Sequence, residues 1–172
     1  MTDAPDNSPH KIKSEIQRIE EDCIHSGKSH FNAGVRWSHY NSWLGIPSVV
    51  LSAAAGTAFF KDYGVAAGLM SSVVAILTSL MTFLKPSERA SSHKGAGDQY
   101  LTLRNDARIF REIEIDQACD VPATIATLAT FTKRRNELNQ ASLQFADRDR
   151  KKARAGIEAG EATHIVDNKE KP

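Results

Sequence analysis

Two long stretches without a charged residue stand almost back to back in the middle of this chain. They are Trp43–Phe60 and Gly64–Leu84, and only Lys61, Asp62 and Tyr63 separate them. An α-helix rises ~1.5 Å per residue, so each stretch is long enough to cross a hydrocarbon core of ~30 Å. The sequence therefore predicts an all-α membrane protein, in which long amphipathic helices flank a two-helix transmembrane hairpin.

A signal peptide or a buried core hairpin would fit these stretches less well. A secretory signal peptide lies at the start of a chain, whereas Trp43 follows a charged, helix-like segment and a second apolar stretch comes at once. A soluble protein could instead bury the hairpin in its core. The rest of this chain is mostly polar, however, and could hardly wrap two helices that are apolar on all sides.

Basic residues predict the orientation of the hairpin. They are frequent on its C-terminal side, present on its N-terminal side, and represented in the connector by Lys61 alone. Under the positive-inside rule, both termini then lie in the cytoplasm. The expected organisation is a disordered segment 1–7, a cytosolic amphipathic helix 8–42, the hairpin 43–84 with spans 43–60 and 64–84, a cytosolic helical region 85–160, and a disordered tail 161–172.

Apolar residues at helical spacing predict how the cytosolic helices pack. The three seams are Ile12, Ile16, Ile19 and Cys23; Tyr100, Leu103, Ala107 and Phe110; and Ile125, Leu128, Phe131 and Leu138. The second seam should weaken at Glu114, which takes the next position in its spacing. Pro86 and Pro122 suit the first turns of new helices, and a polar helix is expected around Asp147–Gly160. The first seam can pack against the C-terminal helices, between subunits, or both.

Small residues recur every four positions along both spans. In lipid there is no hydrophobic driving force for helix association. Rows of small residues promote association because they let two helices approach closely. One row from each span can close the hairpin, and a second row on the second span remains for other subunits. The residues expected at helix-packing and oligomer interfaces are Ser48, Ser52, Gly56, Gly64, Gly68 and Ser72. We therefore expect a homo-oligomer in the lipid bilayer.

Hydroxyl residues on the second span leave two interpretations open. Ser71, Thr78 and Thr82 fall near one helical face and could line a wet pore in an assembly. Each hydroxyl can instead donate to the carbonyl four residues earlier in its own helix. No ionisable side chain lies inside either span, which argues against a proton relay, a transporter or a highly selective filter.

Gly45 and Pro47 suggest a hinge near the start of the first span. A proline inside a helix removes one hydrogen bond and clashes with the carbonyl four residues earlier, so a kink is expected. Such a hinge could carry movement of the cytosolic helices to the hairpin. If Pro47 instead lies in the first turn of its helix, it costs little and marks no hinge.

The sequence offers little support for an enzyme. Its six histidines show no metal-ligand spacing, and no nucleophile, phosphate-binding or dinucleotide motif occurs. Cys23 and Cys119 show neither a CxxC nor a Cys/His spacing, so no disulfide, metal site or cofactor is expected. His39 and His93 are expected just inside the membrane, where they could pair across helices. Aspartates interleave with the basic run 148–154, which favours a solvated helix face over a nucleic-acid partner.

The layout of one helix, two closely joined membrane helices and further long helices resembles the SLATT family, over residues 10–145. The resemblance includes a pattern within KPSERASSHKGAGDQYLTLRNDARIF, formed by Pro86, Ala90, His93, Ala96, Tyr100 and Leu103. It implies a membrane effector of a prokaryotic conflict system, which oligomerises and perforates the inner (cytoplasmic) membrane of an infected cell. It also implies a separate nucleotide-sensing or nucleotide-synthesising partner, because this chain has no recognisable domain of that kind.

Three functions remain open from the sequence. The leading hypothesis is a pore-forming or membrane-disrupting effector in antiviral (antiphage) defence, whose hairpins cluster when the cytosolic helices are triggered. The second is a non-conducting membrane scaffold that recruits a cytosolic partner through its helical arms. The third is a small membrane enzyme that uses histidines at the membrane interface, such as His39 and His93.

Overall fold

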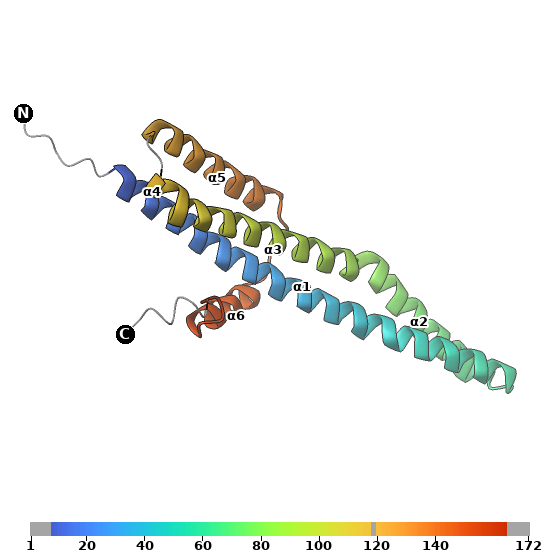
Figure 1. Ribbon diagram of the computed structural model, residues 1–172. Coiled ribbons are helices and arrows are strands. Elements are labelled where there is room, and N and C mark those ends of the chain that lie inside the picture. The colour runs from blue at the N-terminus through green and yellow to red at the C-terminus, as the bar shows by residue number, and fades with distance from the viewer. Residues whose placement is uncertain (1–7, 118–119, 165–172) are drawn as a thin grey trace, which may run out of the picture. The chain divides into compact units, whose positions relative to one another are not determined.

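The computed structural model describes residues 8–117 and 120–164, and all the regular structure in these residues is helical. The predicted all-α class is therefore confirmed (Figure 1). The helices are α1 (Ser8–Phe60), α2 (Gly64–Leu84), α3 (Pro86–Ile109), the π-helix η1 (Phe110–Glu114), α4 (Ile115–Gln117), α5 (Val121–Ala141) and α6 (Asp147–Glu158). The expected disordered segment 1–7, residues 165–172 of the expected tail, and Cys119 lie outside the described residues.

The chain forms two compact units. Met1–Ala33 and His93–Pro172 belong to the first, here called the bundle unit, and Gly34–Ser92 forms the second, the hairpin unit. The boundaries fall inside α1 and α3, so each of these helices contributes to both units. The predicted segments 8–42 and 43–60 are consequently parts of one helix.

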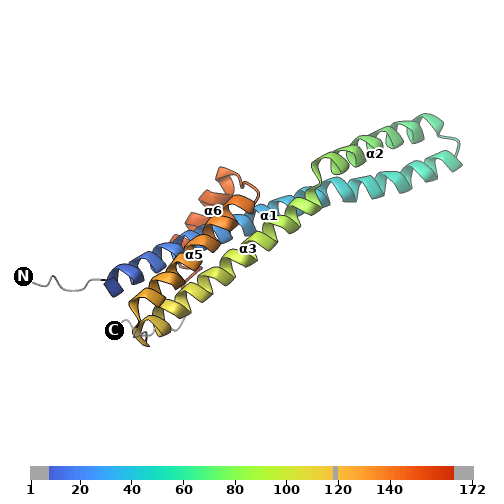
Figure 2. The same cartoon turned by 90° about the horizontal axis from the view of Figure 1, so that it is seen from above.

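The core of the bundle unit lies where α1, α3 and α5 pack side by side (Figures 1 and 2). Its buried residues are Ile12, Ile16, Ile19, Cys23, Tyr100, Leu103, Ala107, Phe110, Ile115 and Leu138. Leu128 and Phe131 of α5 pack against this core. The seam of α1 therefore packs within the chain, as one of the two interpretations predicted. Ile125 was predicted in the third seam, but its side chain is 51% exposed.

Two glycines let α1 and α3 approach closely in the bundle unit. A Cβ atom added to Gly27 would lie 3.2 Å from the Cβ atom of Tyr100 and 3.4 Å from the carbonyl oxygen of Gly97. A Cβ atom added to Gly97 would lie 2.9 Å from the ring of Phe31. Both glycines thus face atoms of the neighbouring helix at or below contact distance, and their missing side chains permit the packing.

The π-helix η1 changes which residues face the core. In η1, the backbone N–H of Ile115 donates to the carbonyl of Phe110, five residues earlier. This wider turn leaves Ile115 buried, at 7% exposed, while Ile113 is 53% exposed. Glu114 is exposed, as the predicted weakening of the seam requires, but the seam resumes at Ile115, which the prediction missed because α-helical spacing does not count the residue that a π turn adds.

The hairpin unit reverses its chain direction at Lys61–Tyr63. Asp62 adopts φ 61°, in the left-handed region that aspartate tolerates better than most residues. Lys85 adopts φ 46° and ends α2, and α3 begins at Pro86, as predicted for a helix restart. Inside α1, the helix continues through Pro47. The interpretation that placed Pro47 in a first helical turn was therefore wrong, and its role as a hinge stays a prediction.

Candidate functional site

The hairpin unit presents a large apolar surface. The structure has two helical stretches long and apolar enough to cross a membrane, and only 6% of the 18-residue apolar window of each is buried. A core helix of a soluble protein would be mostly buried. The large exposed side chains include Trp43, Ile46, Val49, Val50, Phe59, Phe60, Val65, Leu69, Ile76 and Phe83. Contact of such a surface with water is unfavourable, and large exposed apolar surfaces are typical of sites that interact with a membrane or with another protein.

A groove of 540 Å³ opens between α1 and α2, towards the connector. It brings together five of the small or hydroxyl residues singled out in the sequence: Ser52, Gly56, Gly64, Gly68 and Ser71. Ala55, Phe59, Ala67 and Val74 complete its lining. A Cβ atom added to any of the three glycines would meet nothing within 4 Å. Inside this chain, these glycines therefore border open space and do not form a close helix contact.

The other predicted packing and pore-face residues lie outside this groove. Ser48 is buried and its hydroxyl donates to the carbonyl of Leu44 at 2.7 Å. Ser72 is exposed and donates to the carbonyl of Gly68 at 3.0 Å. Thr78 and Thr82 are exposed, and Thr82 donates to the Thr78 carbonyl at 3.0 Å. Ser48, Ser72 and Thr82 thus satisfy their hydroxyls within their own helices.

The predicted hinge residues Gly45 and Pro47 both lie within α1. A Cβ atom added to Gly45 would lie 3.5 Å from the Cε atom of Met81 on α2, which is a normal van der Waals distance. Pro47 lies inside α1 and lacks the N–H that would bond to the carbonyl four residues earlier. The structure therefore places Gly45 where α1 faces α2, without a tight approach between the helices.

Two arginines and two aromatic rings meet in the hairpin unit. The guanidinium of Arg89 lies 4.8 Å from the ring centroid of Trp37, and that of Arg36 lies 5.3 Å from the same ring and 5.9 Å from Tyr40. Trp37 and Tyr40 also pack edge to face, with ring centroids 5.5 Å apart. Cations held over aromatic rings next to a long apolar segment are the combination found at membrane–water interfaces.

The six positions that carry the family resemblance form one buried stripe of α3. Pro86, Ala90, His93, Ala96, Tyr100 and Leu103 are all buried. They follow one another at intervals of three or four residues, which keeps them on one helical face. The pattern in the sequence is therefore a packing surface with one histidine in it.

His93 pairs with His30 of α1, inside the bundle unit. Their Nδ1 atoms lie 2.9 Å apart, and the two side chains are 2% and 1% exposed. The predicted pairing of His93 with His39 was wrong, because His39 is exposed. His30 follows the core residue Cys23 by seven positions, and His93 precedes Tyr100 by seven. This heptad spacing is the signal in the sequence that places each histidine on the core face of its helix, although it does not show that the two meet.

Two aromatic rings pack against His30 of the histidine pair. The Tyr100 ring stacks on His30 at a centroid distance of 5.6 Å, and Phe145 meets His30 edge to face at 5.1 Å. Burial disfavours the charged imidazole and the neighbouring His93 adds to this effect, so the pKa of His30 falls from its usual 6.5 to about 4. At neutral pH His30 is therefore uncharged, and its ring takes part in a buried hydrogen bond with the ring of His93.

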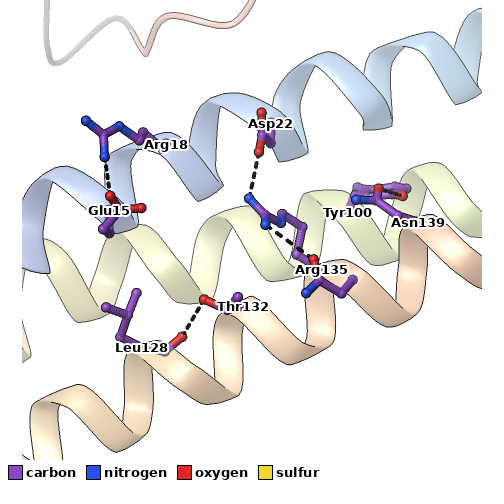
Figure 3. A network of polar contacts seen from close by, with 9 residues as sticks. Glu15, Arg18, Asp22, Tyr100, Leu128, Thr132, Arg135 and Asn139 are labelled. Atoms are coloured by element: carbon purple, nitrogen blue, oxygen red, sulfur yellow. Dashed lines mark hydrogen bonds and ion pairs between the residues drawn. The ribbon is translucent and has the colours of Figure 1, made fainter.

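A polar network continues from Tyr100 towards α5 (Figure 3). The hydroxyl of Tyr100 donates to Oδ1 of Asn139 at 2.6 Å. Arg135 of α5 donates to the carboxylate of Asp22 on α1 at 2.8 Å. These bonds join α5 to α1 and α3.

Comparisons with protein-family models, with curated proteins and with solved structures find no match for this chain. The resemblance to the SLATT family therefore rests on the layout and the residues quoted above. Among residues 8–117 and 120–164, no group of three or more histidine, cysteine, aspartate or glutamate side chains is placed to hold a metal ion.

Proposed function

We propose that this chain is a two-span protein of the prokaryotic cytoplasmic membrane, which self-associates through its hairpin and breaches the bilayer as a defence effector. The observation that carries the proposal is the exposed apolar surface of the hairpin unit. Only 6% of each 18-residue apolar window is buried. Leaving apolar area in water costs ~25 cal/mol per Å². Lipid covers such a surface at no comparable cost, and this supports insertion of both helices.

The ends of the hairpin support its orientation in the bilayer. One cluster lies just before the apolar segment of α1 begins and just after α2 ends. It consists of Arg36, Arg89, Trp37 and Tyr40. Arginines at this end favour the cytoplasmic side. Phe59, Phe60 and Tyr63 are exposed at the opposite end, by the connector. Both termini then lie in the cytoplasm, with the bundle unit attached there.

The groove between α1 and α2 supports self-association. Gly56, Gly64 and Gly68 border open space within the chain, so their small surfaces are free for close contact with a helix of a second copy. Because no ionisable residue lies in 43–60 or 64–84, an assembly of such hairpins would disturb the bilayer without selecting one ion. The trigger then acts on the bundle unit, through the separate nucleotide-linked partner that the family resemblance implies.

Induced expression in bacteria with a membrane-potential dye tests this proposal. We expect depolarisation and growth arrest with the wild-type chain, at least when the chain is clustered by a fused, ligand-inducible dimerisation domain. Gly68→Leu fills the groove and should abolish both effects while membrane insertion is retained. Val65→Leu adds bulk to a side chain that is 83% exposed and outside the groove, so this variant should remain toxic.

Three outcomes would count against the proposal. Unchanged membrane potential in cells with the clustered chain would exclude membrane breach. Recovery of the chain from the soluble fraction after alkaline carbonate extraction would exclude insertion itself. Equal toxicity of Gly68→Leu and wild type would remove the groove from the mechanism.

A membrane scaffold is the second candidate function, and the face of α5 favours it. A shallow depression of 570 Å³ follows residues of α5 alone, including Ile125, Leu128, Thr132 and Asn136. These residues recur at three and four positions, which suits a groove or helix of a cytosolic partner. Silent bilayer recordings together with a partner lost on Ile125→Asp would favour this function over membrane breach.

A further inference from the structure

The bundle unit contains a second pocket, of 220 Å³, between α1 and α3. Its floor is apolar: Ile24, Gly27 and Phe31 come from α1 and Leu101 from α3. Cys23 also lines it, and burial raises the pKa of the Cys23 thiol to about 12, so this group stays uncharged. A cavity of ~150 Å³ with apolar walls already holds a benzene ring. The pocket is therefore large enough for one aromatic ring or a short alkyl chain.

Two cations stand at the side of this pocket. Lys28 comes from α1 and Arg104 from α3, and both side chains are partly buried. Lys28 forms an ion pair with Glu161, and Arg104 donates to the carbonyl oxygen of Ala162 at 3.3 Å. The pocket lining thus has two cations and one carboxylate, which leaves one positive charge in excess. An apolar floor beside an excess cation suits a ligand with an apolar body and an anionic group.

The carboxylate of Glu161 is held at this site by a defined turn. After α6, the N–H of Glu161 donates to the carbonyl of Gly156 at 3.0 Å, and that of Gly160 donates to Ile157 at 2.9 Å. Gly160 adopts φ +85°, so this is the Schellman arrangement that glycine favours at helix ends. A Cβ atom on Gly156 would lie 2.5 Å from the Glu161 carboxylate and 2.8 Å from Lys28 Nζ. Two glycines therefore permit the ion pair.

We propose that this pocket binds a small amphiphilic anion in competition with Glu161. The apolar body of the ligand lies against Ile24, Phe31 and Leu101, and its phosphate or carboxylate group lies between Lys28 and Arg104. The ligand anion replaces the Glu161 carboxylate and the Ala162 carbonyl, and so releases the segment after α6. This inference concerns the bundle unit alone and does not depend on what the hairpin does in the membrane.

Isothermal titration calorimetry on the full chain in lipid nanodiscs tests the site, with phenyl phosphate as the probe and benzoate as the carboxylate counterpart. Inorganic phosphate and benzyl alcohol, which each carry half of the required chemistry, should bind at least tenfold more weakly. Arg104→Met should weaken phenyl phosphate at least tenfold. Glu161→Gln removes the competing carboxylate and should strengthen binding up to about fivefold, the range set by a partly exposed ion pair.

Matched variants separate competition from a general effect of charge. Glu158→Gln removes a carboxylate that pairs with Arg154 outside the pocket, and it should leave the affinity unchanged. Gly160→Ala strains the turn without altering any charge, and it should strengthen binding as Glu161→Gln does. Helix content measured by circular dichroism verifies that each variant is folded. The proposal is overturned if neither phenyl phosphate nor benzoate binds folded Glu161→Gln, or if Glu158→Gln and Glu161→Gln act alike.

Discussion

Glycines serve opposite purposes in the two units of this chain. In the bundle unit, a Cβ atom added to Gly27 would lie 3.2 Å from the nearest atom of the neighbouring helix, and one added to Gly97 would lie 2.9 Å from it. In the hairpin unit, Gly56, Gly64 and Gly68 face no atom within 4 Å. The bundle glycines have a partner inside the chain, whereas the hairpin glycines border a groove that this chain leaves open.

The same contrast holds for large apolar side chains. Ile16 and Ile19 of the bundle unit are 0% and 2% exposed, while Ile46 and Ile76 of the hairpin unit are 65% and 61% exposed. The bundle unit is therefore stabilised by contacts within the chain. The hairpin unit has few such contacts, so its surroundings have to supply the rest.

Truncating a buried isoleucine should show the largest difference between the units. Ile16→Ala removes a fully buried side chain and should lower the free energy of unfolding of the bundle unit by about 4 kcal/mol. Ile76→Ala makes the same change on an exposed site of α2 and should leave bundle stability unchanged. Amide hydrogen exchange of α1 and α3 in the full chain measures both. Equal losses of protection in the two variants would contradict the division into two units.

Acid should destabilise the bundle unit through His30. The pKa of this buried imidazole lies at about 4, below the usual value of 6.5, so the unfolded chain binds more protons between these pH values. Stability is therefore retained above pH ~6.5 and falls by up to about 3 kcal/mol as the pH approaches 4. Exchange protection measured from pH 7 to pH 4 tests this. His30→Phe should flatten the pH dependence, whereas His39→Gln, at an exposed site, should preserve it.

Adding a side chain at a glycine should change the stability of the bundle unit only when the glycine lies in that unit. Gly27→Leu collides with Tyr100 and Gly97 and should lower bundle stability by about 2 kcal/mol, since overpacking outweighs the gain in helix propensity. Gly68→Leu meets open space and should leave the bundle stable. Thermal unfolding followed by circular dichroism measures the difference. A destabilised bundle in Gly68→Leu would show that the units are not independent.

The smallest effect is expected from a single hydroxyl. Tyr100→Phe removes the bond to Asn139 at 2.6 Å and should lower bundle stability by about 1 kcal/mol. Tyr63→Phe removes the hydroxyl of an exposed residue in the connector and should have no effect. Chemical denaturation of the full chain in detergent measures the two variants side by side. An equal loss of stability in Tyr63→Phe would show that the Tyr63 hydroxyl forms a stabilising bond, which the exposure of this residue argues against.

Local patterns in the sequence predicted the helices and their ends well. Pro86 and Pro122 stand in the first turns of α3 and α5, and α6 begins at Asp147, as the turn and proline signals indicated. The four residues of the first seam are buried together. These features depend on residues close in the chain, which is why spacing alone identifies them.

Contacts between distant residues were not predictable in this way. The pairing of His30 with His93 depends on how α1 and α3 are aligned along each other, and the ion pair of Lys28 with Glu161 likewise depends on how distant segments meet. Spacing gives the face on which a residue lies but not its level along the partner helix. The groove at Gly56, Gly64 and Gly68 was missed for the same reason. Small residues show that another helix can approach closely, but they do not show which helix it is.

The π-helix η1 also acts as a correction of phase. An inserted residue in a regular α-helix would turn every following side chain by ~100°, and η1 absorbs that residue locally. Deleting one residue between Phe110 and Ile115 would restore regular α-helical hydrogen bonding and would keep Ile115 on the core face, because residues four apart share a face of an α-helix as residues five apart do across a π turn. The same deletion elsewhere in α3 would turn every following side chain by ~100°. The π turn is consequently a place where the chain can change its length by one residue without disturbing the core.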